Sequence, residues 1–531
     1  MRSSRISRRT LLHLGAAGAF GAAVPLLVAC GGGASTAASQ SGGTATSGST
    51  AVAAPSSAAS PAVSSASSTA ATSASVGSAT STASSASLVQ STSTEVASSS
   101  AALSAQSTAP AQAKTTLAFW HYGGTPYQAA FGKWAGQFNA ASGAVEVKNM
   151  LYSTNNNQKL TVVMAAGTGP DAYLSDSDGF KNRAFAGLEG PIDDLAARDK
   201  TVGANLQQML PSSVQWYHYN GKSYGLPWDY GVSALTYNLD HVRAAGLTPP
   251  AELAADPAKW TWDTLQQYAA KLTVQAGGAV DRAGLHLGWD GYEGSWYSLA
   301  LAHGGSYYNQ ALDQCTIAGP ACVEALDYAA AMAKAGSNAE PTWWMGITKA
   351  NKNAAGAFTA GKISMHYGVS AFWSSLEQAK TGIAWDAAML PYDPKNGKAG
   401  NWSNMAGLVI NPQSKHRPEV FPFLVYLTGA AVQDTIASAT NECPARLDSV
   451  AKTYLDPKVA GPPAGRPTLK PAIDASVTDG TPYVNEDDAW NWMTSAAMDA
   501  YSGKRTAKDA LAALQAQVQA AIDAAKARGK P

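Results

Sequence analysis

The sequence predicts an α/β protein built from two lobes, and two observations support this prediction. In residues 114–531, short apolar strand-like runs alternate with amphipathic helical segments. This order is typical of βαβ units around a mainly parallel sheet. The same 418 residues are too many for one simple core and are a natural size for two lobes.

The individual elements are placed by local pattern. Short apolar runs beside glycine turns predict strands, and apolar residues with a 3.6-residue period predict helices. Thr506 and Asp509 have the spacing of a helix start. In chain order, we predict strand 117–120, helix 127–140, strand 145–147, helix 160–166, strand 171–174, strand 233–237, a helix starting at 261–265, helix 322–335, strands 362–366 and 408–410, and helices 486–501 and 506–525.

The carboxyl ends of two predicted strands carry polar and aromatic side chains. His121 and Tyr122 follow the first strand, and Ser175 and Asp176 follow the third. Ligands of open α/β sheets bind beyond the carboxyl ends of the strands. We therefore expect these four side chains to lie near any ligand.

Residues 1–30 have the features of an export signal. Four arginines and no acidic residue lie within the first nine positions, and a broken apolar stretch runs from Leu11 to Ala29. This stretch is too short and too interrupted to span a bilayer, so we predict a signal peptide. Residues 7–12, Ser-Arg-Arg-Thr-Leu-Leu, resemble a twin-arginine export signal, although paired arginines also occur in ordinary secretory signals.

The end of this stretch predicts a lipid anchor. Leu27-Val28-Ala29-Cys30, followed by glycines, resembles the lipobox of bacterial lipoproteins, in which the cysteine receives a diacylglycerol. Two or three acyl chains anchor a protein stably, at about 0.8 kcal/mol per buried CH₂. We therefore predict lipidation at Cys30 and a location on the outer face of the cell membrane, which is the periplasm where an outer membrane is present.

Residues 31–113 form a spacer by composition. They consist almost entirely of Ser, Ala, Thr and Gly, and Glu95 is their only charged residue. Such a segment cannot bury enough apolar surface to offset chain entropy, so we predict a disordered linker. A flexible coil of this length has a root-mean-square reach on the order of 50 Å.

Charge and cysteine usage narrow the function classes. Without the four arginines of the signal, 33 basic and 37 acidic residues remain, a net charge of −4. This balance argues against nucleic acid or anionic lipid as the ligand.

Cys315 and Cys322 are seven positions apart and are predicted to form a disulfide outside the cell. Cys443 has no accompanying histidine or carboxylate pattern and is interpreted as a small buried hydrophobe.

Tryptophan is unusually frequent in the predicted folded region. All 15 tryptophans follow residue 113, which is more than core packing requires. Tryptophan is favoured where a flat apolar face meets a partly polar partner.

A series of short motifs resembles the extracellular solute-binding proteins of ABC transporters, in the sugar-binding group similar to maltose-binding protein. The resemblance covers nearly all of 114–531, and its strength lies in the order of the motifs. They are Ala165–Asp171, Phe185–Leu188 with Pro191–Leu195, Tyr224–Pro227, Leu235–Asn238, Trp260–Leu265, Phe358–Met365, Met389–Pro391 and Ser502–Leu511.

The resemblance implies a two-lobed periplasmic-binding-protein-like fold of class II, with a hinge of several chain crossings and a ligand cleft between the lobes. The crossings should fall near 231–235, 404–408 and 445–455. One lobe should comprise 114–231 with 405–450, and the other 232–404 with 451–531. The lobes should close around the ligand by a hinge motion. The permease and ATPase should be separate chains, and we expect a monomer without cofactor or metal.

A sugar presents hydroxyls at its rim and C–H groups on its faces, so its site combines aromatic faces with polar side chains. The resemblance places such residues in the cleft, and Trp490 stands where maltose-binding protein carries a sugar-stacking tryptophan. Ser175 stands where that protein has another tryptophan, so stacking in the first lobe must differ. The candidate ligand-binding residues are Trp120, His121, Tyr122, Ser175, Asp176, Trp228, Asp229, Tyr230, Trp296, Trp343, Trp344, Trp373, Trp402, Asn404, Arg446 and Trp490.

Three other function classes are alternatives to a sugar receptor. Glycosidases use two carboxylates, and Asp176/Asp178 and Glu486–Asp488 are acidic groups, but such clusters usually serve as helix caps or solvated surface, so no enzyme is predicted. A receptor for a polyamine or for iron is the alternative, since Tyr307-Tyr308 resembles the paired tyrosines of iron-binding relatives, whereas the histidines lack metal-ligand spacing. A ligand-free adhesion or structural lipoprotein is the third class.

Overall fold

A computed structural model describes residues 113–153, 157–177, 179–289 and 295–529. The chain divides into two units, Met1–Ala109 and Pro110–Pro531, and every described element belongs to the second. The predicted signal peptide, Cys30 and all but the last residue of the predicted linker lie outside the described residues, as does Asp178.

The first sheet has six strands in the order β14-β6-β13-β3-β1-β2. β1 is parallel to β2 and β3, whereas β13 runs antiparallel to β3 and β6, and β14 antiparallel to β6. The sheet is therefore mixed rather than wholly parallel. The bounds are β1 (Thr115–Tyr122), β2 (Val145–Ser153), β3 (Ala172–Asp176), β6 (Gly225–Tyr230), β13 (Met405–Ile410) and β14 (Cys443–Pro444).

Helices α2 (Thr125–Ala141), α16 (Arg417–Leu427) and α17 (Ala430–Thr440) gather beside this sheet. α2 has Pro126 in its first turn, where a missing N–H costs nothing, and it turns Phe131 inward. Phe131 and Phe423 each lie 5.3 Å from the ring of Phe119 on β1. The sequence segments before and after the second sheet therefore share one aromatic core.

The other elements near these strands in the chain are short. They are α3 (Asn157–Ala165), α4 (Phe180–Phe185), α5 (Asp193–Ala196), α6 (Lys200–Leu206), α7 (Pro211–Trp216), the pair β4 (His218–Tyr219) and β5 (Lys222–Ser223), α18 (Leu447–Ser449), η1 (Val450–Tyr454) and α19 (Pro457–Ala460).

The second sheet has five strands in the order β11-β7-β10-β9-β8. β10 is parallel to β9 and antiparallel to β7, which also pairs with β11. β8 closes the other edge as a hairpin with β9. The bounds are β7 (Ser233–Asn238), β8 (Val274–Ala276), β9 (Ala279–His286), β10 (Ile363–Val369) and β11 (Trp385–Ala388).

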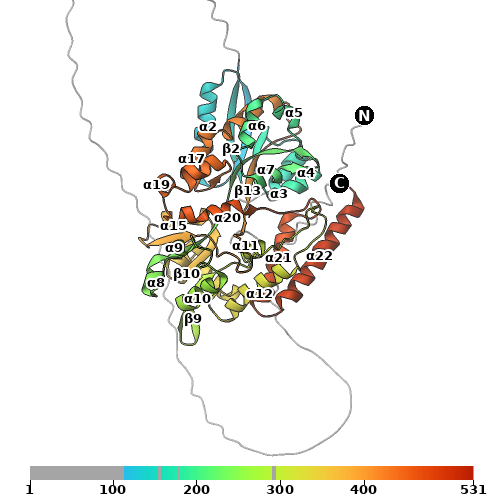
Figure 1. The fold of residues 1–531 in the computed structure, drawn as a ribbon. Coiled ribbons are helices and arrows are strands. Elements are labelled where there is room, and N and C mark those ends of the chain that lie inside the picture. The colour runs from blue at the N-terminus through green and yellow to red at the C-terminus, as the bar shows by residue number, and fades with distance from the viewer. Residues whose placement is uncertain (1–112, 154–156, 178, 290–294, 530–531) are drawn as a thin grey trace, which may run out of the picture. The chain divides into compact units, whose positions relative to one another are not determined.

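Helices between β7 and β13 surround this second sheet, and the C-terminal helices α21 and α22 lie beside α12 (Figure 1). Thr506 caps α22 by accepting the N–H of Asp509, as its spacing predicts. The bounds are α8 (Leu239–Ala244), α9 (Pro250–Leu253), α10 (Trp262–Leu272), α11 (Tyr297–Ala302), α12 (Pro320–Lys334), α13 (Pro341–Ala350), α14 (Ala354–Thr359), α15 (Ala371–Ala379), η2 (Arg466–Leu469), α20 (Lys470–Asp474), α21 (Glu486–Tyr501) and α22 (Ala507–Arg528), with the two-stranded β12 (Asn401–Trp402) and β15 (Ser476–Val477).

The chain passes between the two sheets at adjacent points. Only Gly231 and Val232 separate β6 from β7, and Gly231 donates its N–H to Asn404, just before β13. Ser370, at the end of β10, donates its N–H to Val232. The chain leaves the first sheet again after β14 and reaches η2, which packs on β11. The exact lobe boundaries stay a prediction.

The predicted disulfide is wrong in this structure. Among the described residues, Cys315, Cys322 and Cys443 are all free and buried. Cys315 forms a β-bridge with Tyr308, whereas Cys322 lies in the first turn of α12 with its sulfur 3.9 Å from the carbonyl oxygen of Ser306. Each sulfur is thus fixed by its own local packing, and a spacing of seven residues did not predict this.

Length and apolar character decide whether a helix can cross a bilayer. None of the described helices alone is both long and apolar enough to cross a membrane. α16 and α17 satisfy the criteria only as a pair, and they bend by 66° at the break between them.

Candidate ligand-binding site

One edge of the first sheet collects the ends of five strands. The parallel strands β1, β3 and β6 end there, and the antiparallel strands β13 and β14 begin there. Asp176 of β3 and Asp229 of β6 are both register partners of Ala406 on β13. The two carboxylates therefore flank the same residue of the central strand, at the edge where the chain crosses to the second sheet.

Two tyrosines lie beside these carboxylates. The rings of Tyr122 and Tyr127 are stacked with centroids 6.1 Å apart. Tyr127 donates its hydroxyl to Oδ2 of Asp229 at 3.1 Å. Burial raises the pKa of Tyr122 well above its usual value, and the nearby charges of Asp229 and Asp176 raise it further. The tyrosines stay protonated and can donate hydrogen bonds at neutral pH.

Glu442 adds a third carboxyl group at this edge. It immediately precedes β14 and accepts a hydrogen bond from Ser370 Oγ at 3.1 Å. Burial raises the pKa of Glu442 to about 7. Burial, followed by the charge of Glu442, also raises the pKa of Asp229 well above its usual value. The two carboxyl groups therefore hold protons more readily than isolated acids do.

Trp120 provides a flat aromatic face next to this group. It is half-buried and stacks on Tyr152 with ring centroids 6.0 Å apart. His121 points to the opposite side of β1, where it is fully buried and stacked on Phe131 at 4.8 Å. Of the three consecutive residues predicted to meet a ligand, the structure therefore brings Trp120 and Tyr122 to the polar edge and His121 to the core.

A second group of aromatic residues lies at the carboxyl end of β9 and beside it on β10. His286 and His366 are register partners on these parallel strands, and their Nδ1 atoms lie 3.1 Å apart. Trp344 of α13 stacks on His286 at 4.1 Å, and Phe372 of α15 lies 4.3 Å from His366. Burial lowers the pKa of His366 to about 4 and that of His286 well below its usual value. Both imidazoles are neutral at physiological pH.

The family of the chain is given by comparison with known proteins. Residues 133–468 match the family of bacterial extracellular solute-binding proteins. The chain belongs to this family. Members of the family are binding proteins rather than enzymes, and they work on the extracellular or periplasmic side of the membrane.

Curated relatives of this solute-binding protein match part of it. A binding protein from Brucella abortus is 25% identical over 276 residues, 51% of this chain and 61% of the relative. A maltotriose-binding protein from Pyrococcus abyssi is 25% identical over 45% of this chain and 46% of its own. An arabinooligosaccharide-binding protein from Bacillus subtilis is 27% identical over 31% of this chain and 36% of its own length. The chain spans about three fifths of the first relative's length.

Solved structures match the folded region as a whole. An ABC substrate-binding protein from Listeria monocytogenes, in complex with cycloalternan, has a TM-score of 0.63 at 19% identity, covering 77% of this chain and 100% of that one. The sugar-binding protein MalE from Xanthomonas citri has a TM-score of 0.63 at 19% identity, covering 78% and 98%. The GacH receptor of Streptomyces glaucescens has a TM-score of 0.61 at 20% identity, and the match covers 78% of this chain and 99% of the receptor. The solute-binding protein therefore has the two-lobed α/β fold.

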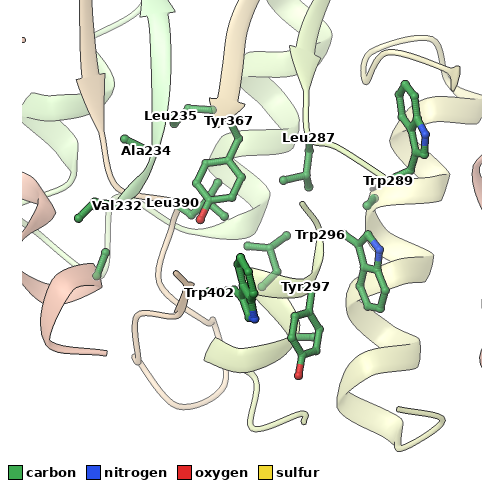
Figure 2. Close-up of a cluster of buried hydrophobic side chains, with 14 of the residues drawn as sticks. Val232, Ala234, Leu235, Leu287, Trp289, Trp296, Tyr297, Tyr367, Leu390 and Trp402 are labelled. Carbon is green, nitrogen blue, oxygen red and sulfur yellow. The ribbon is translucent and has the colours of Figure 1, made fainter. Parts of the chain in front are cut away.

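Several predicted tryptophans lie inside the solute-binding protein. Trp228, Trp296, Trp373, Trp402 and Trp490 are each at most 1% exposed. Figure 2 shows Trp296 and Trp402 within a buried cluster that includes Tyr297 and Tyr367. A ligand role for these five residues stays a prediction that would require the surrounding side chains to move.

The contacts of these tryptophans are those of core residues. Trp228 packs on Phe131 at 4.8 Å. Trp373 donates to Thr236 Oγ1 at 2.9 Å and lies under the guanidinium of Arg466. Trp402 donates to Asp479 at 3.2 Å and packs edge-on against Trp490 at 4.9 Å.

The remaining predicted residues have internal partners in the structure. Trp343 donates to Val280 O at 2.9 Å, and Tyr230 is fully buried between β13 and β14. Ser175 accepts a hydrogen bond from Arg183 at 2.6 Å, and Asn404 accepts one from Ser177 at 2.7 Å. Arg446 forms an ion pair with Asp448 at 2.6 Å.

Sequence reasoning missed Tyr127, Glu442, His286, His366 and Phe372. His366 ends a predicted strand, so the rule of carboxyl strand ends, applied to the second sheet, would have found it. Tyr127 and Glu442 are brought to the edge by α2 and by the pairing of β14 with β6. No local sequence pattern predicts the pairing of β14 with β6.

The iron-receptor alternative rests on a pair of adjacent tyrosines. Tyr307 and Tyr308 are both buried, and Tyr307 donates its hydroxyl to Ala489 O at 2.9 Å. Within the described ranges, no group of three or more His, Cys, Asp or Glu residues could hold a metal ion.

Proposed function

We propose that the chain is the substrate-binding lipoprotein of an ABC importer, which captures an extracellular sugar or oligosaccharide between its lobes and delivers it to a membrane permease. The observation that carries this proposal is the polar and aromatic edge formed by Trp120, Tyr122, Asp176 and Asp229. Carboxylates satisfy sugar hydroxyls, and aromatic faces cover sugar C–H groups.

The ligands of the relatives support a carbohydrate ligand for this chain. The relatives include a maltotriose-binding and an arabinooligosaccharide-binding protein. Similar structures were solved with cycloalternan, acarbose, mannotriose and D-tagatose. These ligands are sugars or sugar-like compounds, which agrees with an edge that contains hydroxyls, carboxyls and rings.

A thermal-shift screen of the purified protein against maltotriose, mannotriose, arabino-oligosaccharides and D-tagatose tests the proposal. A sugar present at 100 times its Kd stabilises the protein by roughly 2.7 kcal/mol. A stabilising sugar whose effect is lost in the Trp120→Ala variant supports the proposal. No stabilisation by any sugar, with stabilisation by another solute, contradicts it.

A polyamine is the second candidate ligand. The grouping of Asp176, Asp229 and Glu442 favours a cation, since three carboxyl groups lie at this edge beside tyrosine rings. Spermidine belongs in the same screen, and binding of spermidine with no binding of sugar would select this function.

The anchor and the transporter partners complete the proposal. Cys30 would carry the lipid, and the monomeric receptor would dock on separate permease subunits. Replacing Cys30 by serine tests the anchor in cells. The protein should move from the membrane fraction to the soluble or secreted fraction, and an unchanged membrane fraction would contradict lipidation at this residue.

A further inference from the structure

The pair of buried histidines on β9 and β10 has no assigned role. His286 and His366 face each other through Nδ1 at 3.1 Å, and both are less than 10% exposed. Trp344 and Phe372 enclose the pair. Two histidines without a third ligand do not make a metal site among the described residues.

The other nitrogen of His366 points along its strand toward the chain crossing. A Cβ atom at Gly368 would lie 2.8 Å from His366 Nε2, so Nε2 lies directly over this glycine. Gly368 is followed by Val369, the last residue of β10, and by Ser370, which bonds to Val232 at the crossing. The structure gives His366 Nε2 no hydrogen-bond partner among the residues it describes, although His366 is 92% buried. Because glycine has no Cβ, Gly368 leaves Nε2 of His366 uncovered on this side of the second sheet.

We propose that His286 and His366 form an uncharged group that recognises a hydroxyl of the ligand. His366 Nε2 contacts the hydroxyl over Gly368, the ring of Phe372 lies beside the contact, and His286 is a positioning residue. This inference rests on the proposed function, because it assigns the second wall of the same ligand cleft.

The Nδ1–Nδ1 bond fixes the hydrogen-bonding role of Nε2. A neutral imidazole has one N–H donor and one acceptor nitrogen. If His286 donates through Nδ1, His366 accepts through Nδ1 and carries its proton on Nε2; in the reverse case, Nε2 of His366 is the acceptor. A hydroxyl can accept or donate, so it satisfies Nε2 in both cases. The ligand end that lies here is therefore predicted to be a neutral hydroxyl-bearing ring.

Two variants of one residue separate the contact from the packing. In His366→Gln, the side-chain amide reaches the position of Nε2 and keeps a polar group over Gly368. In His366→Asn, the shorter amide reaches only the position of Nδ1 and keeps the bond to His286. One net hydrogen bond corresponds to about 1 kcal/mol, or roughly fivefold in Kd. By calorimetry with the sugar that gives the largest shift in the screen, we expect His366→Asn to weaken binding at least fivefold and His366→Gln to bind within about threefold of the wild type.

Gly368→Ala provides an independent test. Gly368 has no left-handed backbone angle, so alanine does not strain the backbone there, but its Cβ would lie 2.8 Å from Nε2 and so covers this atom or displaces the imidazole. Gly346→Ala on α13 is the matched control, since its Cβ would meet no atom within 4 Å. We expect weaker sugar binding for Gly368→Ala only. Equal binding by both variants, or equal loss in His366→Asn and His366→Gln, would overturn the inference.

Nitrogen-15 spectra of histidine in the wild-type protein give a readout that needs no variant. We expect opposite protonation of Nε2 in His286 and His366, and a shift of the His366 Nε2 signal when the sugar is added. A sugar that binds without changing this signal overturns the inference and leaves the proposed function intact. If none of the sugars binds, the proposed function fails, and the inference fails with it.

Discussion

The hydroxyl of Tyr127 on α2 donates a hydrogen bond to Oδ2 of Asp229 on β6 at 3.1 Å. Asp229 is 3% exposed and lies at the level of Asp176, on the other side of β13. A single phenol thus holds a buried carboxyl group at the edge where the chain crosses between the sheets.

Replacement of Tyr127 by phenylalanine should weaken both the fold and the site. The variant leaves a buried carboxyl oxygen of Asp229 without its donor, at a cost of about 1–2 kcal/mol. Urea unfolding measures the loss, and calorimetry measures the accompanying loss of sugar affinity. Tyr426→Phe is the control, because its hydroxyl bonds Gln137 at the exposed surface, and it should change stability by less than about 0.5 kcal/mol. Equal effects of the two variants would remove the role given to Tyr127.

Glu442 should give the stability of the protein a distinct pH dependence. Its pKa is raised by burial to about 7, whereas an unfolded glutamate titrates near 4.3. Between these values the folded state binds more protons, so this group's contribution to the unfolding free energy falls as pH rises, by up to roughly 1.4 kcal/mol per pH unit.

The Glu442→Gln variant removes this contribution together with the effect of the Glu442 charge on the pKa of Asp229. Glutamine cannot ionise, so the variant should gain stability relative to the wild type as pH rises from about 4.5 to 7. His286 and His366 act in the opposite direction, because burial lowers their pKa, but they are common to both proteins and cancel in the difference. If the difference in unfolding free energy between the variant and the wild type stays constant from about pH 4.5 to 7, Glu442 titrates normally.

Trp120 and Trp228 should respond to substitution in different ways. Trp228 is fully buried against Phe131, so Trp228→Ala should cost about 3–5 kcal/mol of stability. Trp120 is half-buried at the sheet edge, so Trp120→Ala should cost less stability and weaken sugar binding roughly tenfold, about 1.4 kcal/mol. Unfolding and calorimetry on both variants check this. A binding loss in Trp228→Ala at preserved stability would reverse the assignment.

The first sheet edge was largely predictable from the sequence. Tyr122 and Asp176 directly follow strands with clear apolar patterns, and the ends of parallel strands meet at one edge whatever their order. Helix α21 was predicted at its observed bounds, and the structure shows that Asn485 caps it and that one face is buried. These features depend on local pattern alone.

The other parts of the site depend on long-range pairing. Glu442 reaches the edge only because β14 pairs with β6 across more than 200 residues of chain. The resemblance placed the tryptophans in the cleft by their position in the chain, but burial is decided by neighbours such as Arg466 over Trp373 and Trp490 against Trp402. The spacing of Cys315 and Cys322 likewise carried no information on where each sulfur points.

Calorimetric titration of the wild-type protein tests the central claim most directly. Maltotriose, mannotriose, arabino-oligosaccharides and D-tagatose should be titrated alongside spermidine under identical conditions. We predict saturable binding of at least one sugar with a micromolar or tighter Kd, and loss of that binding in Trp120→Ala. Saturable binding of spermidine together with no binding of any sugar would contradict the claim.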